Sequence, residues 1–297
     1  MFYILYAFGW LITLLPLRVL YLISDFFYLV VYYIVRYRKP VVRENIFNSL
    51  PAKTEKERRK IERGFYRFFC DLFVETMKEI HMGKEEIRRR MTYGNVDEII
   101  AQYAKGKSVM LMTAHYGNWE WLLNLPESFP AENKVYQIYK QLRNEKFDKL
   151  IYSLRSKYGG NNIEKRELLR SMYNLKNEGK NSIFIMVSDQ TPNGRKIHLW
   201  TPFLNQDTPT VTGTEQLARK FDYPVFYADI YRVRRGYYHC EFIPISLEPK
   251  ATAEFEITET YMKLLEQTIH RNPEYWLWSH RRWKFKRDNA ESASPVK

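Results

Sequence analysis

The chain has few cysteines and lacks the residue spacings typical of a metal site. Its 297 residues include 2 cysteines, Cys70 and Cys240, which lie far apart and show no metal-ligand spacing. The 6 histidines form neither an HxxxH nor an HExxH pattern. We therefore expect buried, reduced thiols, as is usual in a cytoplasmic compartment, and we predict no metal ion and no cofactor.

Signatures of nucleic-acid recognition are also missing from the sequence. We find no zinc-finger spacing, RNA-recognition signature or glycine-rich phosphate loop, so nucleic acid is not the expected partner. Acidic residues are scarce relative to basic ones, 34 against 47, which gives a formal net charge of +13. The basic residues are spread along the chain, and such a balance favours anionic lipid, a phosphorylated substrate or an acidic carrier protein as the partner.

The N-terminus has almost no charge. Within residues 2–35 only Arg18 and Asp25 are charged, and Pro16 divides the run into halves shorter than the about 20 residues of a membrane span. The run lacks the features of a cleaved signal peptide, and the basic residues after it are expected to stay in the cytoplasm. We therefore expect residues 1–38 to form a membrane anchor that either spans the bilayer or lies in its interface as two kinked helices. Two buried core helices are the alternative interpretation.

The rest of the chain alternates between apolar strands and amphipathic helices, which predicts an α/β sandwich. We expect one catalytic domain over residues 39–287 and a disordered tail over residues 288–297. The expected strands are 109–113, 134–140, 181–187, 225–233 and 237–245. The expected helices are 54–80, 95–106, 143–158, 167–178, 212–221 and 253–270.

The stretch Lys107–Trp121 carries the strongest chemical signal. An apolar strand, Val109–Thr113, ends in a polar turn that holds His115 and Glu120. Enzymes with α/β folds expose reactive groups at such strand ends, where a histidine can accept a proton while an acid fixes its tautomer. No GxSxG nucleophile motif is present, so the attacking hydroxyl is expected to belong to the substrate, as in acyl transfer from a thioester to an alcohol. A structural histidine fits the spacing equally well.

Several blocks of the sequence resemble one family in the same order. The segment His115–Glu120, HYGNWE, resembles the HxxxxD/E motif of glycerolipid-type acyltransferases, in the HxGNWE form of the lipid A biosynthesis (lauroyl/myristoyl) acyltransferase family. The other similar blocks are Arg43-Glu44-Asn45 with Leu50-Pro51, Arg143-Asn144 through Arg155 and Gly159, Ser188-Asp189-Gln190 with Pro202-Phe203-Leu204 and Thr210–Ala218, and Pro273–Lys284. The resemblance covers nearly the whole chain.

The resemblance implies a mixed central sheet flanked by helices, similar to glycerol-3-phosphate acyltransferase, behind an N-terminal membrane anchor. It also implies a bacterial inner-membrane protein whose catalytic domain is cytoplasmic. The implied reaction moves a fatty acyl chain from an acyl thioester, on acyl carrier protein or coenzyme A, to a hydroxyl of a lipid A precursor or related glycolipid. A lysophospholipid or an amine-bearing lipid is an alternative acceptor, and a catalytically inactive lipid-binding scaffold is an alternative function.

The family motif also implies roles for individual residues. His115 would be the general base and Glu120 the motif's acid, while Asp189, at the end of another strand, is a rival acid for orienting the imidazole. The thioester oxyanion needs hydrogen-bond donors, for which Arg155 is our first choice. The other expected substrate-binding or oxyanion residues are Asn118, Gln190, Arg281 and Arg282.

The closing segment, Pro273–Arg287, combines cations with aromatic residues. Arg281 and Arg282 are interleaved with Trp276, Trp278 and Trp283. Indole rings prefer the headgroup region of a bilayer, and arginines pair with phosphate. We therefore expect this segment to meet the membrane with its rings at headgroup depth. A solvated basic tail is the alternative interpretation.

Overall fold

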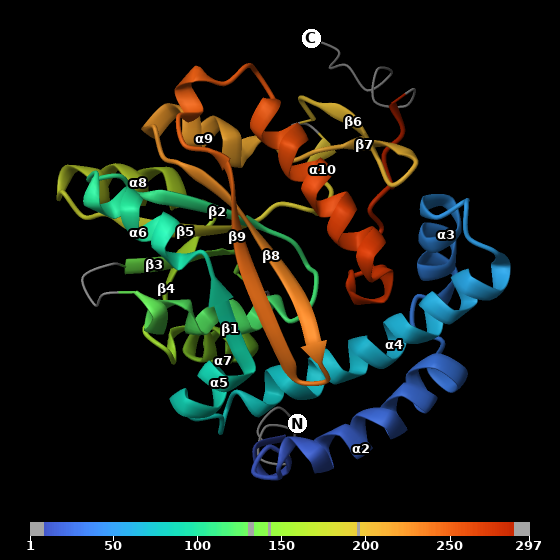
Figure 1. Ribbon diagram of the computed structural model, residues 1–297. Coiled ribbons are helices and arrows are strands. Elements are labelled where there is room, and N and C mark those ends of the chain that lie inside the picture. The colour runs from blue at the N-terminus through green and yellow to red at the C-terminus, as the bar shows by residue number, and fades with distance from the viewer. Residues whose placement is uncertain (1–8, 130–133, 142–143, 195–196, 288–297) are drawn as a thin grey trace.

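The computed structural model describes residues 9–129, 134–141, 144–194 and 197–287 (Figure 1). The expected tail at 288–297, the first part of the anchor at 1–8 and the first residue of the family's middle block, Arg143, lie outside the described residues.

A seven-stranded sheet forms the centre of the described chain, in the order β1-β9-β8-β2-β5-β3-β4. Its strands are β1 (Met91–Gly94), β2 (Val109–Thr113), β3 (Lys134–Tyr139), β4 (Asn161–Glu164), β5 (Ser182–Val187), β8 (Val225–Arg234) and β9 (Tyr237–Ser246). All neighbours pair in parallel except β8 and β9, which form an antiparallel hairpin. The sheet is therefore mixed, which confirms the expected α/β fold. A separate two-stranded sheet pairs β6 (Trp200–Phe203) with β7 (Gln206–Pro209).

Helices cover both faces of the sheet because its central strand is buried on both sides. Met110 and Met112 of β2 join one apolar cluster, whereas Val109 and Leu111 join the other. The first cluster includes residues of α3 (Lys39–Ser49), α8 (Leu168–Asn177), α9 (Gly213–Phe221) and α10 (Glu256–Arg271). The second includes residues of α5 (Lys84–Arg90), α6 (Val96–Ala104) and the 3-10 helix η2 (Trp119–Ser128). Outside these two groups lie α7 (Glu145–Ser156) and the short 3-10 turns η4 (Pro249–Ala251) and η5 (Pro273–Tyr275).

The apolar N-terminal run forms a helix that lies along the domain. α2 (Leu17–Leu29) begins after Pro16 and continues as the π-helix η1 (Val30–Val35). Together they make one helical stretch long and apolar enough to cross a membrane, and 28% of it is buried. α2 runs beside the long helix α4 (Glu55–Lys78) (Figure 1). Its buried face packs on α4, and its other face exposes large apolar side chains.

Candidate active site

The register of two parallel strands places His115 beside Asp189. Thr113 at the end of β2 lies opposite Val187 at the end of β5, so the residues two positions further on are level with each other. The Nδ1 atom of His115 lies 2.8 Å from Oδ1 of Asp189. The backbone N–H of His115 donates to Oδ2 of the same carboxylate over 3.1 Å, and the indole N–H of Trp276 donates to it over 2.9 Å. Three donors therefore orient the Asp189 carboxylate.

This pair is asymmetric in its exposure to solvent. The His115 side chain is 21% exposed and the Asp189 side chain 2%. Burial acts to lower the pKa of His115, but the charge of Asp189 and its hydrogen bond outweigh burial, so the pKa is raised. Burial acts to raise the pKa of Asp189, but His115 and the hydrogen bonds from Trp276 and the backbone lower it. The aspartate is therefore ionised and orients a histidine whose ring reaches solvent.

The second ring nitrogen of His115 is positioned to accept a proton. Nε2 lies 3.2 Å from the side-chain amide nitrogen of Gln190, which can only donate. This contact, together with the carboxylate on Nδ1, assigns the proton of the neutral ring to Nδ1. The lone pair of Nε2 accepts the Gln190 N–H in this structure, so a hydroxyl group can donate to Nε2 once it displaces that hydrogen bond.

Glu120 does not contact the imidazole; it forms a second ion pair. Its carboxylate accepts hydrogen bonds from Nη2 of Arg155 over 3.1 and 3.3 Å and from Nε over 3.4 Å. Trp119 joins the two pairs, because its indole N–H donates to Glu120 over 3.1 Å and its ring lies 5.0 Å from that of His115. The sequence did not decide whether Glu120 or Asp189 orients the imidazole. In the structure it is Asp189 that contacts the ring.

The turn that carries His115 is fixed by the closing segment of the chain. The N–H of Gly117 donates to the carbonyl of Tyr275, and the N–H of Leu277 donates to that of His115, both over 3.0 Å. Gly117 adopts a φ of 57°, and a Cβ atom there would lie 2.9 Å from the side chain of Ile230. Only glycine fits this turn without strain.

Asn118 lies behind this turn. Its side chain is fully buried, its Oδ1 accepts the N–H of Trp121 and its amide donates to Glu75 over 2.8 Å. The expected role as an oxyanion donor would therefore require this amide to leave Glu75. Glu75 also accepts hydrogen bonds from Tyr21 of α2 over 2.8 Å and from Tyr238 of β9 over 2.9 Å. One buried carboxylate thus connects the N-terminal helix to the turn that carries His115.

Replacing Glu75 with alanine is expected to destabilise the protein. Three donors that are largely shielded from water would lose their common acceptor, so the free energy of unfolding should fall by about 3–5 kcal/mol. Chemical denaturation in detergent would measure the change, with Glu254→Ala as an exposed control expected to stay within about 0.5 kcal/mol of wild type. Equal stability of the two variants would contradict a structural role for this carboxylate.

The two arginines of the closing segment have different surroundings. Arg281 is exposed, whereas the Arg282 side chain is buried and none of its three guanidinium nitrogens has a partner in the described part of the chain. Burial lowers the pKa of Arg282 to about 10, although the charge of Asp189 acts in the opposite direction. A headgroup could reach Arg281 directly, but it could reach Arg282 only if the surrounding chain moved.

The prediction that Trp276 and Trp278 lie at headgroup depth is wrong. Both side chains are buried, because their indole N–H groups hydrogen-bond inside the protein, to Asp189 and to the carbonyl of Pro273 respectively. Asn45 of α3 donates over 2.8 Å to the carbonyl of Trp278 and fixes the segment from the other side. The aromatic residues of this segment therefore build the site rather than a membrane surface.

A second histidine, His280, lies near His115 and Asp189. Burial lowers the pKa of His280 to about 4, and its Nε2 accepts the N–H of Thr191 over 3.4 Å, so this ring is neutral and structural. In the described part of the chain, no group of three or more His, Cys, Asp or Glu side chains is arranged to hold a metal ion. Cys70 and Cys240 are both free and buried.

Comparison with known proteins identifies the family. The family model described as bacterial lipid A biosynthesis acyltransferase matches residues 1–285. No curated protein matches the chain. The matched region contains the His115–Asp189 and Glu120–Arg155 pairs and most of the closing segment that fixes the turn with His115. The chain therefore belongs to the bacterial lipid A biosynthesis acyltransferase family.

Proposed function

We propose that this protein transfers a fatty acyl chain from an acyl thioester to a hydroxyl group of a lipid A precursor or a related glycolipid, with His115 as general base. The observation that carries the proposal is the 2.8 Å contact between Nδ1 of His115 and buried Asp189, which makes Nε2, beside Gln190, the unprotonated nitrogen of the ring. Membership of the family also supports acyl transfer, since the family is described as acyltransferases of lipid A biosynthesis.

In the proposed reaction, the lipid hydroxyl gives its proton to Nε2 of His115 as its oxygen attacks the thioester carbonyl. Asp189 stabilises the resulting imidazolium and keeps Nδ1 protonated throughout. The tetrahedral intermediate then collapses, the C–S bond breaks and the imidazolium returns the proton to the departing sulfur. The products are an ester and a free thiol, and no covalent intermediate forms on the protein.

Two side chains are our candidates for stabilising the oxyanion. The Gln190 amide lies beside Nε2, where the attacking oxygen must arrive. Arg155 uses Nε and Nη2 on Glu120, while its Nη1 makes no hydrogen bond with the described residues. We propose that these donors bind the thioester carbonyl oxygen as it becomes an oxyanion, and that Glu120 holds Arg155 in place. Arg281 is our candidate contact for a phosphate on the acceptor.

The proposal places the reaction at the cytoplasmic side of the bacterial inner membrane. Residues 1–38 would be the membrane anchor and residues 39–287 the catalytic domain. The net charge of +13 favours an acidic acyl carrier protein as donor over a neutral partner, with coenzyme A as the alternative carrier.

Lipid mass spectrometry of a host that lacks the gene tests this function. We expect one lipid A species to lose the mass of a single acyl chain, and the wild-type gene but not His115→Ala should restore it. Loss of a chain from a phospholipid or an amine-bearing lipid would replace the proposed acceptor. An unchanged lipid profile would contradict acyl transfer and support a lipid-binding scaffold.

A further inference from the structure

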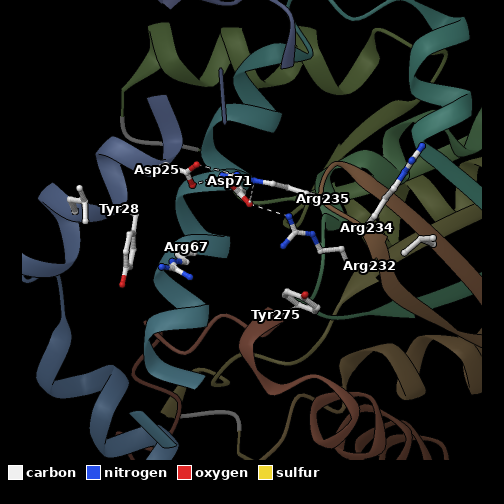
Figure 2. Close-up of a pocket in the computed structure, with 10 residues that line it drawn as sticks. Asp25, Tyr28, Arg67, Asp71, Arg232, Arg234, Arg235 and Tyr275 are labelled. Atoms are coloured by element: carbon white, nitrogen blue, oxygen red, sulfur yellow. Dashed lines mark hydrogen bonds and ion pairs between the residues drawn. The ribbon is translucent and has the colours of Figure 1, made fainter. Parts of the chain in front are cut away.

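A polar pocket lies where the N-terminal helix meets the β8–β9 hairpin (Figure 2). Its volume is about 630 Å³, and its walls come from α2, the middle of α4, the tip of the hairpin and the closing segment. None of His115, Asp189, Glu120 or Arg155 lines it. The pocket is therefore separate from the candidate active site, and its function is not explained by acyl transfer.

The charges that line this pocket do not balance. Asp71 accepts hydrogen bonds from Arg232 over 3.0 Å and from Arg235 over 2.5 Å, and Asp25 accepts from Arg235 over 2.7 Å. Both carboxylates are thus occupied by the two hairpin arginines. Arg67 of α4 has no hydrogen bond or ion pair with the described residues, and its guanidinium lies 5.1 Å from the centre of the Tyr28 ring. The lining therefore carries four arginines against two aspartates, and Arg67 is one of the two arginines that no carboxylate neutralises.

Arg67 faces the space between α4 and the hairpin (Figure 2). Figure 2 shows the guanidinium groups of Arg67 and Arg232 on opposite sides of the space between α4 and the hairpin. Arg234 also lines the pocket, but its guanidinium points away from this space and lies 3.9 Å from the centre of the Tyr237 ring. Because Arg234 is turned away, a singly charged anion between Arg67 and Arg232 would balance the excess positive charge that faces this space.

The surroundings of the pocket indicate that this anion belongs to a lipid. Leu29 and Val233, which line the pocket, are exposed, as are other large apolar residues nearby in the chain. These residues are Leu22, Phe26, Tyr33, Ile34 and Val35 in α2 and η1, and Phe73 in α4. An apolar helical face beside cations is typical of helices that lie in the membrane interface. A phosphodiester headgroup would enter the pocket while its acyl chains stayed on this apolar face.

We propose that this pocket binds the phosphodiester headgroup of an anionic phospholipid, between Arg67 and Arg232, and so holds the domain at a fixed depth on the membrane. β8 runs parallel to β2, so the hairpin leaves the sheet at the edge where His115 lies. The carbonyl of Tyr275, another lining residue, accepts the N–H of Gly117 in the catalytic turn. A lipid bound here would hold that edge against the bilayer. This inference does not depend on the proposed acyl transfer.

Calorimetric titration of the full chain in neutral detergent tests the proposal. The titrants are a short-chain phosphatidylglycerol, a phosphatidylcholine of equal chain length and inorganic phosphate. Arg67→Ala and Arg234→Ala form a matched pair, because each removes one exposed cation from the same corner of the protein. We expect wild type to prefer phosphatidylglycerol, Arg67→Ala to bind it on the order of tenfold more weakly, and Arg234→Ala to lose about fivefold at most.

Three results would overturn the proposal. Equal losses in the two variants would mean that surface charge alone attracts the lipid. Equal affinity of wild type for both phospholipids would exclude headgroup recognition by charge. Binding of inorganic phosphate as tight as that of phosphatidylglycerol, with the same dependence on Arg67, would identify a site for free anions rather than for lipid. None of these binding measurements depends on acyl transfer. They therefore test the lipid site even if the proposed function is wrong.

Discussion

Replacing His115 with alanine is expected to lower kcat/KM for acyl transfer by roughly 10²–10⁴-fold, the range that general-base catalysis supplies. The variant keeps the turn, because Leu277 bonds to the backbone of residue 115 and not to its ring. It removes the only side chain whose basic nitrogen lies beside Gln190 in the described part of the chain. Initial rates with a radiolabelled acyl carrier protein thioester and an underacylated lipid A precursor would measure the loss.

A matched histidine variant separates this effect from general damage to the protein. His270 is half exposed on α10 and its Nε2 lies 3.8 Å from Glu266. His270→Ala should therefore keep activity within about threefold of wild type, since surface substitutions rarely change a fold. A His115→Ala variant as active as His270→Ala would remove His115 from the mechanism.

Replacing Asp189 with asparagine is expected to produce a loss of similar size with a different pH dependence. Three N–H groups point at the two oxygens of Asp189, so an asparagine NH₂ must face at least one donor. The variant also loses the negative charge that stabilises the imidazolium. We expect kcat/KM to fall roughly 10²–10⁴-fold, with some loss of stability from the mismatched donors.

The sign of the pH effect follows from the direction of the His115 pKa. Asp189 raises this pKa, so wild-type activity should be lost as the pH falls through the raised value and the imidazole becomes protonated. In Asp189→Asn the charge is gone, and the acid limb of the kcat/KM profile should move to lower pH. An unchanged limb would mean that another group titrates. Thermal unfolding measured in parallel would separate this shift from loss of fold.

The central part of the fold could be predicted from the sequence because its signals are local. The strand Val109–Thr113 is confirmed with its expected bounds, and the hairpin follows from two apolar runs around a glycine turn. Strands such as β4, Asn161–Glu164, were not predicted, because four mostly polar residues at a sheet edge show no alternation. The segment after Trp119 forms a 3-10 helix, η2, with Pro126 inside it.

The site was harder to predict because it depends on contacts between distant parts of the chain. Spacing pointed to Glu120 as readily as to Asp189, and only the register of β2 against β5 brings Asp189 to the imidazole. Trp119 and Trp276 contact the paired residues, yet no local pattern marks a tryptophan as a hydrogen-bond donor to a buried acid. Arg282 was predicted to meet phosphate, and its burial follows from packing that composition does not reveal.

Direct transfer of the acyl chain to the lipid is the central claim, and a balance of products measures it. The purified protein is mixed with a radiolabelled acyl thioester and the acceptor lipid, and labelled lipid, free thiol and protein-bound label are counted together. We predict one labelled lipid for each thiol released, no label on the denatured protein, and neither product above background with His115→Ala. Label retained covalently on the protein, or thiol released without labelled lipid, would contradict the account.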